Sequence, residues 1–112
     1  MVAFTDHDVL IPHPELADEN FLPLNAYEME IHEHYPVKLG SKTCHICLIA
    51  LEPDNVKPVC FHRSKYLVGN GANYVSQVKY DENESDYERE YTGECINDIM
   101  KKARDNGFFC YI

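Results

Sequence analysis

Histidine and cysteine recur two residues apart in two segments that we predict to be neighbouring strands. His45 and Cys47 form one such pair, and Cys60 and His62 form the other. Residues at positions i and i+2 of a strand point to the same face. If a turn centred on Pro53-Asp54 joins the two strands, Cys47 faces Cys60. His45 then faces His62, and all four side chains lie within reach of one tetrahedral zinc ion. The sequence therefore offers a candidate zinc site at His45, Cys47, Cys60 and His62.

Two other interpretations of these four residues stay open. Free cysteines are commonly buried as small apolar side chains, so the same face can be an ordinary half-buried sheet without metal. A cysteine and a histidine can also act as nucleophile and base, which requires a third group to orient the base and a donor for the oxyanion. The sequence marks neither of these groups, so we expect a protein that is not an enzyme.

A second set of metal-ligating side chains alternates with apolar residues along residues 26–39. This set comprises Glu28, Glu30, His32, Glu33 and His34. Such residues can bind a metal ion or transfer protons. The plainer interpretation is the solvated face of a strand whose other face is buried, because Tyr27, Met29 and Ile31 occupy the alternate positions. We favour this second interpretation.

The strands that must position these residues follow from the hydrophobic pattern. The alternation over residues 26–39 predicts a half-buried strand. Residues 43–51 are almost continuously apolar, which is typical of a central strand. Two further strands are predicted over residues 59–68 and 74–80, joined at Asn70-Gly71, a dipeptide typical of hairpin turns. Together these segments predict an antiparallel meander.

The C-terminal part of the chain predicts a helix and a short last strand. Thr92 is a suitable N-cap, and apolar residues recur at helical spacing from Ile96 to Ala103. Gly107 is expected to end the helix before a strand over residues 108–112. The predicted fold class is therefore α+β, with an antiparallel β-meander of four to five strands and one C-terminal helix packed on one face.

The length of 112 residues fits a single domain with one core. Prolines make residues 1–25 an irregular N-terminal segment with at most one short helix, starting at Pro14. The β-meander then covers residues 26–80, an acidic loop covers residues 81–91, and the helix and final strand cover residues 92–112.

Charge and cysteine content restrict the partners and the compartment. The formal net charge is -9, whereas binding to nucleic-acid phosphates requires Lys and Arg. We therefore expect no direct binding to nucleic acid. No apolar run reaches the ~18 residues of a transmembrane helix, and the first residues lack the features of a signal peptide. An odd number of cysteines without an export signal predicts reduced thiols. We expect a cytoplasmic protein with no membrane partner.

The acidic loop over residues 81–91 holds six carboxylates and two tyrosines. Spaced carboxylates can imitate a phosphate backbone, and tyrosines supply interface area. The plainer alternative is a loop kept soluble by its charge. The residues we predict to contact a partner are Glu84, Asp86, Tyr87, Glu88, Glu90 and Tyr91.

This loop, together with the acidic N-terminal third and the lack of catalytic motifs, predicts a non-catalytic binding protein. We expect an inhibitor or regulator that docks onto a basic protein, such as a nucleic-acid-binding enzyme, by nucleic-acid mimicry. Small acidic inhibitors of phages and viruses share this size and charge. The alternative is a small zinc-binding module that uses the Cys/His cluster.

Overall fold

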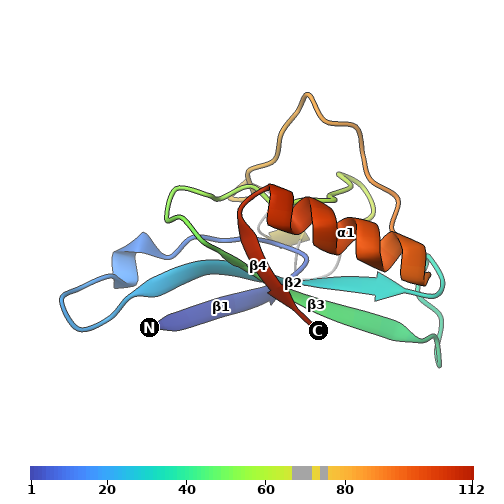
Figure 1. The fold of residues 1–112 in the computed structure, drawn as a ribbon, viewed down its shortest axis with the longest axis horizontal. Coiled ribbons are helices and arrows are strands. Elements are labelled where there is room, and N and C mark those ends of the chain that lie inside the picture. Colours follow the sequence, from blue (N-terminus) through green and yellow to red (C-terminus); the bar gives the residue numbers. More distant parts are fainter. Residues whose placement is uncertain (67–71, 74–75) are drawn as a thin grey trace.

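A four-stranded sheet carries one helix on one of its faces (Figure 1). The structure is a computed structural model and describes residues 1–66, 72–73 and 76–112. Its elements, in chain order, are β1 (Val2–His7), a short 3-10 helix (Pro14–Leu16), β2 (Pro23–His32), β3 (Thr43–Ala50), α1 (Gly93–Asp105) and β4 (Phe108–Tyr111). The strand order is β1-β2-β3-β4. The predicted α+β class with a C-terminal helix is confirmed.

The sheet is mixed, so the prediction of a purely antiparallel meander is wrong. β1 pairs with β2 in parallel, whereas β2 with β3 and β3 with β4 pair antiparallel. The prediction that residues 1–25 are irregular is also wrong over β1 and the start of β2. Pro23 is compatible with β2 because it occupies the first position of the strand, where a missing N–H donor is tolerated.

The β2–β3 hairpin and α1 form at the predicted places, but the strand predicted over residues 26–39 ends at His32, and residues 33–39 form no strand. Met29 and Ile31 of β2 and Leu48 of β3 are fully buried, and they pack with Ile99 of α1. The Thr92 hydroxyl accepts a hydrogen bond from the Cys95 backbone N–H at 3.1 Å, which caps the helix. The helix ends before Gly107, whose positive φ of 81° suits glycine. The larger cluster of buried apolar residues therefore lies between α1 and one face of the sheet, and a second, smaller cluster contains Val9, Phe61 and Tyr66.

The predicted strand over residues 59–68 is wrong across its described part, because residues 59–66 form no strand. Cys60 has a φ of 51°, which a strand does not allow. Side chains take the place of ladder partners here. The Tyr27 hydroxyl accepts a hydrogen bond from the Val59 N–H at 2.9 Å, and Arg89 Nε donates to the Cys60 carbonyl at 3.1 Å. The start of the segment is thus buried as irregular backbone, and side chains bond to the Val59 N–H and the Cys60 carbonyl.

The predicted strand over residues 74–80 is also absent where the structure describes it, because residues 76–80 form a turn and irregular backbone. The predicted hairpin at Asn70-Gly71 lies outside the described residues. Within the described ranges, no helix has the length and the apolar composition needed to cross a membrane.

Candidate metal centre

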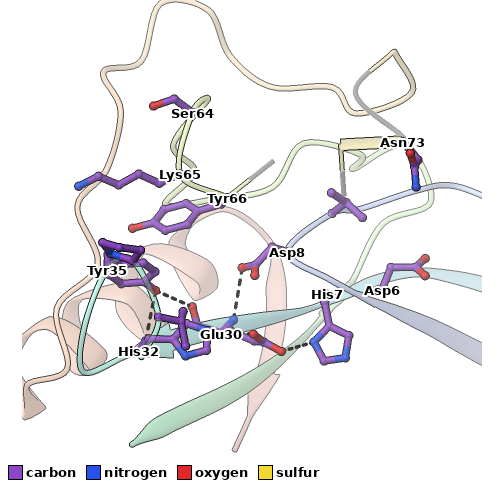
Figure 2. Close-up of a pocket in the computed structure, with 13 residues that line it drawn as sticks. Asp6, His7, Asp8, Glu30, His32, Tyr35, Ser64, Lys65, Tyr66 and Asn73 are labelled. Atoms are coloured by element: carbon purple, nitrogen blue, oxygen red, sulfur yellow. Dashed lines mark hydrogen bonds and ion pairs between the residues drawn. The ribbon is translucent and has the colours of Figure 1, made fainter. Parts of the chain in front are cut away.

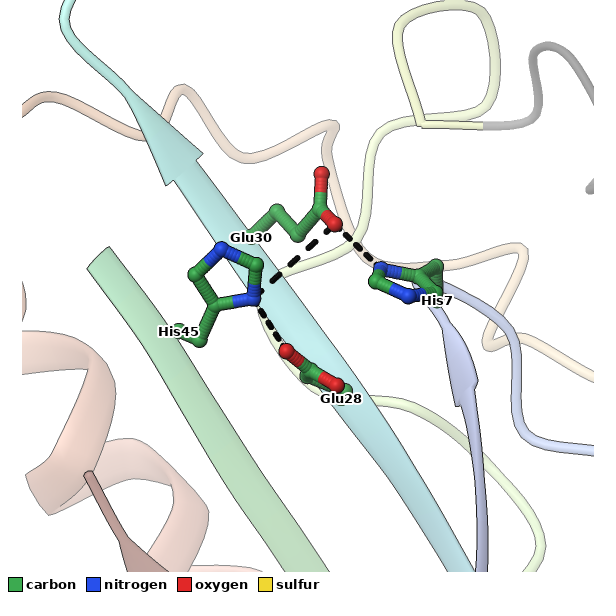
Figure 3. A group of neighbouring side chains, drawn as sticks. All are labelled: His7, Glu28, Glu30 and His45. Carbon is green, nitrogen blue, oxygen red and sulfur yellow. Dashed lines mark hydrogen bonds and ion pairs between the residues drawn. The ribbon is translucent and has the colours of Figure 1, made fainter. Parts of the chain in front are cut away.

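Four side chains from three adjacent strands converge on the face of the sheet opposite α1 (Figure 3). They are His7 of β1, Glu28 and Glu30 of β2, and His45 of β3. Each offers one nitrogen or oxygen, and these four atoms all lie within 4.8 Å of one another. We call this group the His/Glu cluster.

Strand register explains why these residues meet. His7 is the partner of Glu28 across the parallel β1–β2 pair, and His45 is the partner of Glu30 across the antiparallel β2–β3 pair. Glu28 and Glu30 are two residues apart on β2, so they share one face. The core residues of β2 occupy the alternate positions and point to α1. Register and pleat together place all four side chains at one point of the sheet.

Hydrogen bonds already connect imidazoles to carboxylates within the cluster. His7 Nδ1 contacts Glu30 Oε1, and His45 Nδ1 contacts Glu28 Oε1. His45 Nδ1 also lies 3.9 Å from Glu30 Oε1. The two glutamate side chains are each 20% exposed, whereas those of His7 and His45 are 64% and 46% exposed, so the centre is open to solvent on the histidine side.

A fifth residue, His32, orients Glu30 from outside the cluster. Its Nε2 donates to Glu30 Oε2 at 2.9 Å, and its Nδ1 lies 3.1 Å from the Thr43 hydroxyl. Burial of Glu30 opposes ionisation, but the hydrogen bond from His32 and the nearby His7 outweigh it and keep the pKa of Glu30 below its ordinary value. Glu30 is therefore ready to act as an anionic ligand.

A buried ion pair holds the backbone behind the cluster. Arg89 is 3% exposed, and its guanidinium donates to the Asp8 carboxylate and, at 3.1 Å, to the Glu30 carbonyl. Asp8 in turn donates its N–H to the Glu28 carbonyl at 2.7 Å and accepts the Glu30 N–H at 3.3 Å. Burial raises the pKa of Asp8, and the charge of Arg89 opposes that rise. The pair fixes the backbone on which His7, Glu28 and Glu30 stand.

The structure does not bring the four predicted zinc ligands together. The predicted pairing of Cys47 with Cys60 is wrong, because Cys47 is the register partner of Glu28 and of Tyr111. Cys60 is buried in the core, and His62 lies beside Glu88, with 3.3 Å between His62 Nε2 and Glu88 Oε1. Of the predicted set, His45 alone belongs to the His/Glu cluster.

His7 is not among the residues that the sequence pattern marks, and the pattern favours a solvated face for the two glutamates. His7 lies in the segment predicted to be irregular, so no face could be assigned to it. The alternation of residues places Glu28 and Glu30 on one strand face but does not distinguish a metal site from solvated surface. The signal that could have found the site is the Glu-x-Glu alternation facing a strand that carries His45, because both features are visible in the sequence.

The predicted partner-binding residues are dispersed between surface and core. Glu84 and Glu90 are exposed, and Tyr91 is 38% exposed. Tyr87 instead packs against the core, and its hydroxyl donates to Asp98 at 2.7 Å.

The remaining two acidic residues of the predicted set have partners within the chain. The Asp86 carboxylate accepts the Arg63 N–H at 3.0 Å, and Glu88 pairs with Lys65. Part of the negative charge of this segment is therefore compensated internally.

Comparisons with protein-family models, with curated proteins and with solved structures found no match. The chemistry of the site is therefore what indicates the function.

Proposed function

We propose that this chain is a metal-binding protein whose His/Glu cluster holds one divalent transition-metal ion. The observation that carries the proposal is the convergence of two imidazole nitrogens and two carboxylate oxygens within 4.8 Å. Zn²⁺ is bound by these atom types, whereas Ca²⁺ and Mg²⁺ favour sites made of oxygen atoms. The two glutamates would compensate the charge of the ion.

The surroundings of the cluster support this assignment. Residues that ligate metals are commonly held by further hydrogen bonds, which fix their orientation. Here His32 holds Glu30, and the Asp8–Arg89 pair holds the backbone of Glu28 and Glu30. The alternative for the same residues is a network of surface ion pairs, which typically contributes 0–1 kcal/mol per pair to stability. Metal stoichiometry distinguishes the two.

The test compares the native chain with a cluster variant, Glu28→Gln with His45→Ala. After dialysis against a chelator, the apo protein is titrated with Zn²⁺, and bound metal is counted by elemental analysis. We expect one equivalent for the native chain and at least a tenfold loss of affinity in the variant. The control is His13→Ala with Glu15→Gln, an exposed His–Glu pair 3.1 Å apart outside the cluster. Equal uptake by the native chain and both variants would contradict the proposal.

We also propose that the acidic segment 81–91 docks onto a basic protein, such as a nucleic-acid-binding enzyme, without catalysing a reaction. One observation favours this second function. Arg63 Nη2 donates to the carbonyls of Asp81, Glu82 and Glu84 at 3.3, 3.1 and 2.8 Å, which holds the backbone of the segment in place. Exposed carboxylates on a fixed backbone can match a fixed pattern of positive charge.

A further inference from the structure

A cavity of about 1140 Å³ adjoins the His/Glu cluster (Figure 2). It lies beyond the end of β1, beside the last residues of β2. Residues 6–9 form one wall, and residues 35–37 and 64–66 form others. Cavities that hold small organic ligands typically measure ~300 to 1,000 Å³, so this one is large enough for such a ligand.

The cavity reaches the cluster from one side. His7 and Glu30 belong to the cluster and also line the cavity, whereas Glu28 and His45 lie outside the lining. His32, which holds Glu30, lines the cavity as well. A molecule in the cavity therefore approaches a bound ion past His7 and Glu30.

The cavity wall is mainly apolar by surface area, and three of its charged side chains, Asp8, Glu30 and Lys65, have partners within the chain. Val9 and Tyr66 are buried to 2% and 3% exposure, and Tyr35 and Val37 extend the apolar surface. Asp8 on the wall is paired with Arg89. Such a wall suits an aromatic or branched apolar group rather than a highly charged one.

We infer that the cavity binds a small organic carboxylate whose oxygen coordinates the metal ion and whose aromatic or branched body packs against Val9, Tyr35 and Tyr66. The inference rests on the proposed metal centre. Glu28 and Glu30 together compensate the charge of a divalent ion, so the loaded centre does not repel an anionic oxygen. Carboxylate oxygen is also a ligand that such ions accept.

The test uses the full chain loaded with Co²⁺, whose visible absorption responds to a change of ligands. Phenylacetate and acetate offer the same carboxylate and differ in the aromatic group. We expect phenylacetate to change the spectrum to saturation at a concentration at least tenfold lower than acetate requires. Val37 is 56% exposed and lines the cavity, so Val37→Trp should obstruct it without disturbing the core.

Val37→Trp should weaken phenylacetate binding at least tenfold and leave Co²⁺ uptake unchanged. Val2→Trp is the matched control, because Val2 is also an exposed valine and does not line the cavity. Equal half-saturation by the two carboxylates, or equal phenylacetate binding by the two tryptophan variants, overturns the inference and leaves the metal centre standing. A chain that takes up no Co²⁺ overturns both.

Discussion

Arg89 is the residue that connects the acidic segment to the candidate metal centre. Its sequence neighbours are acidic and exposed, yet its own side chain is fully buried. The guanidinium bonds to Asp8, Glu30 and Cys60 and lies 3.6 Å from the centroid of the Tyr66 ring. A buried charge is tolerated when it is paired and hydrogen-bonded. The single basic residue of this segment thus serves the fold.

Removing this charge should destabilise the protein strongly. Arg89→Met leaves the Asp8 carboxylate buried without its partner, and breaking such a pair costs about 3–5 kcal/mol. Urea denaturation followed by circular dichroism measures the loss. Arg104→Met removes an exposed arginine and should change the free energy of unfolding by less than ~0.5 kcal/mol. A similar small change in both variants would show that the buried pair does not stabilise the fold.

Cys60 should make stability fall at alkaline pH. Burial raises the pKa of its thiol from 9.0 to about 12. The unfolded chain ionises first, so the contribution of Cys60 to stability is complete below pH 9 and is lost as the pH rises to 12. That interval corresponds to about 4 kcal/mol.

Denaturation curves from pH 8 to 11 under reducing conditions, for the native chain and Cys60→Ala, should show a shallower pH dependence in the variant. Cys44 lies in the same chain with a thiol that is less buried, and Cys44→Ala is the control. Parallel curves for all three proteins would contradict the expected contribution.

At the scale of elements, periodicity predicted the parts of the fold that pack a regular face against the core. The β2–β3 hairpin and α1 are of this kind, because their apolar residues recur with the period of the element. Residues 59–66 could not be predicted in the same way. Their backbone partners include the side chains of Tyr27 and Arg89, which lie far away in the sequence.

The same difference explains how much of the site could be predicted. Side chains alternate between the two faces of a strand, which is why Glu28 and Glu30 could be assigned to one face. The structure shows this arrangement and pairs Glu30 with His45. His7 could not be predicted, because the parallel pairing of β1 depends on a crossover through residues 8–22 that no short pattern marks. The ligand set was therefore incomplete without the topology.

The packing of α1 gives a test at this scale. Ile99 is fully buried between α1 and the sheet, so Ile99→Asp places a charge in the core and should lower the free energy of unfolding by several kcal/mol. Asn97→Asp introduces the same side chain at an exposed position of the same helix. Thermal denaturation should show a large drop in melting temperature for the first variant and a small change for the second. Equal melting temperatures would mean that α1 does not pack as described.

For the whole molecule, the exposed acidic residues determine how a basic partner would be attracted. The chain has a formal net charge of -9, and Glu84 and Glu90 are exposed at either side of the residues that pair with Arg63 and Lys65. Long-range attraction depends on the uncompensated charges, and salt screens it over ~8 Å at physiological ionic strength. Asp86, Glu88 and Tyr87 support the fold and are poor choices for testing binding alone.

Neutralising Glu84 and Glu90 should therefore slow association with a basic partner recovered by affinity capture. We expect Glu84→Gln with Glu90→Gln to reduce both the association rate and its salt dependence, with little change in dissociation. The control, Glu52→Gln with Asp54→Asn, removes the same charge from exposed positions elsewhere. Stopped-flow or biosensor kinetics at several salt concentrations measure the difference. Identical rates for the two variants would show that net charge alone matters and that segment 81–91 is no docking site.

The position of β1 at the edge of the sheet has a consequence for local unfolding. Edge elements open without unfolding the whole protein more readily than central ones do. Opening of β1 would carry His7 away, while Glu28, Glu30 and His45 stay together on β2 and β3. An ion held by all four side chains would therefore require β1 to stay paired with β2. Metal binding would suppress the opening of β1 by mass action. The rate at which a protease cuts within Val2–His7 would then report the free metal concentration around the protein.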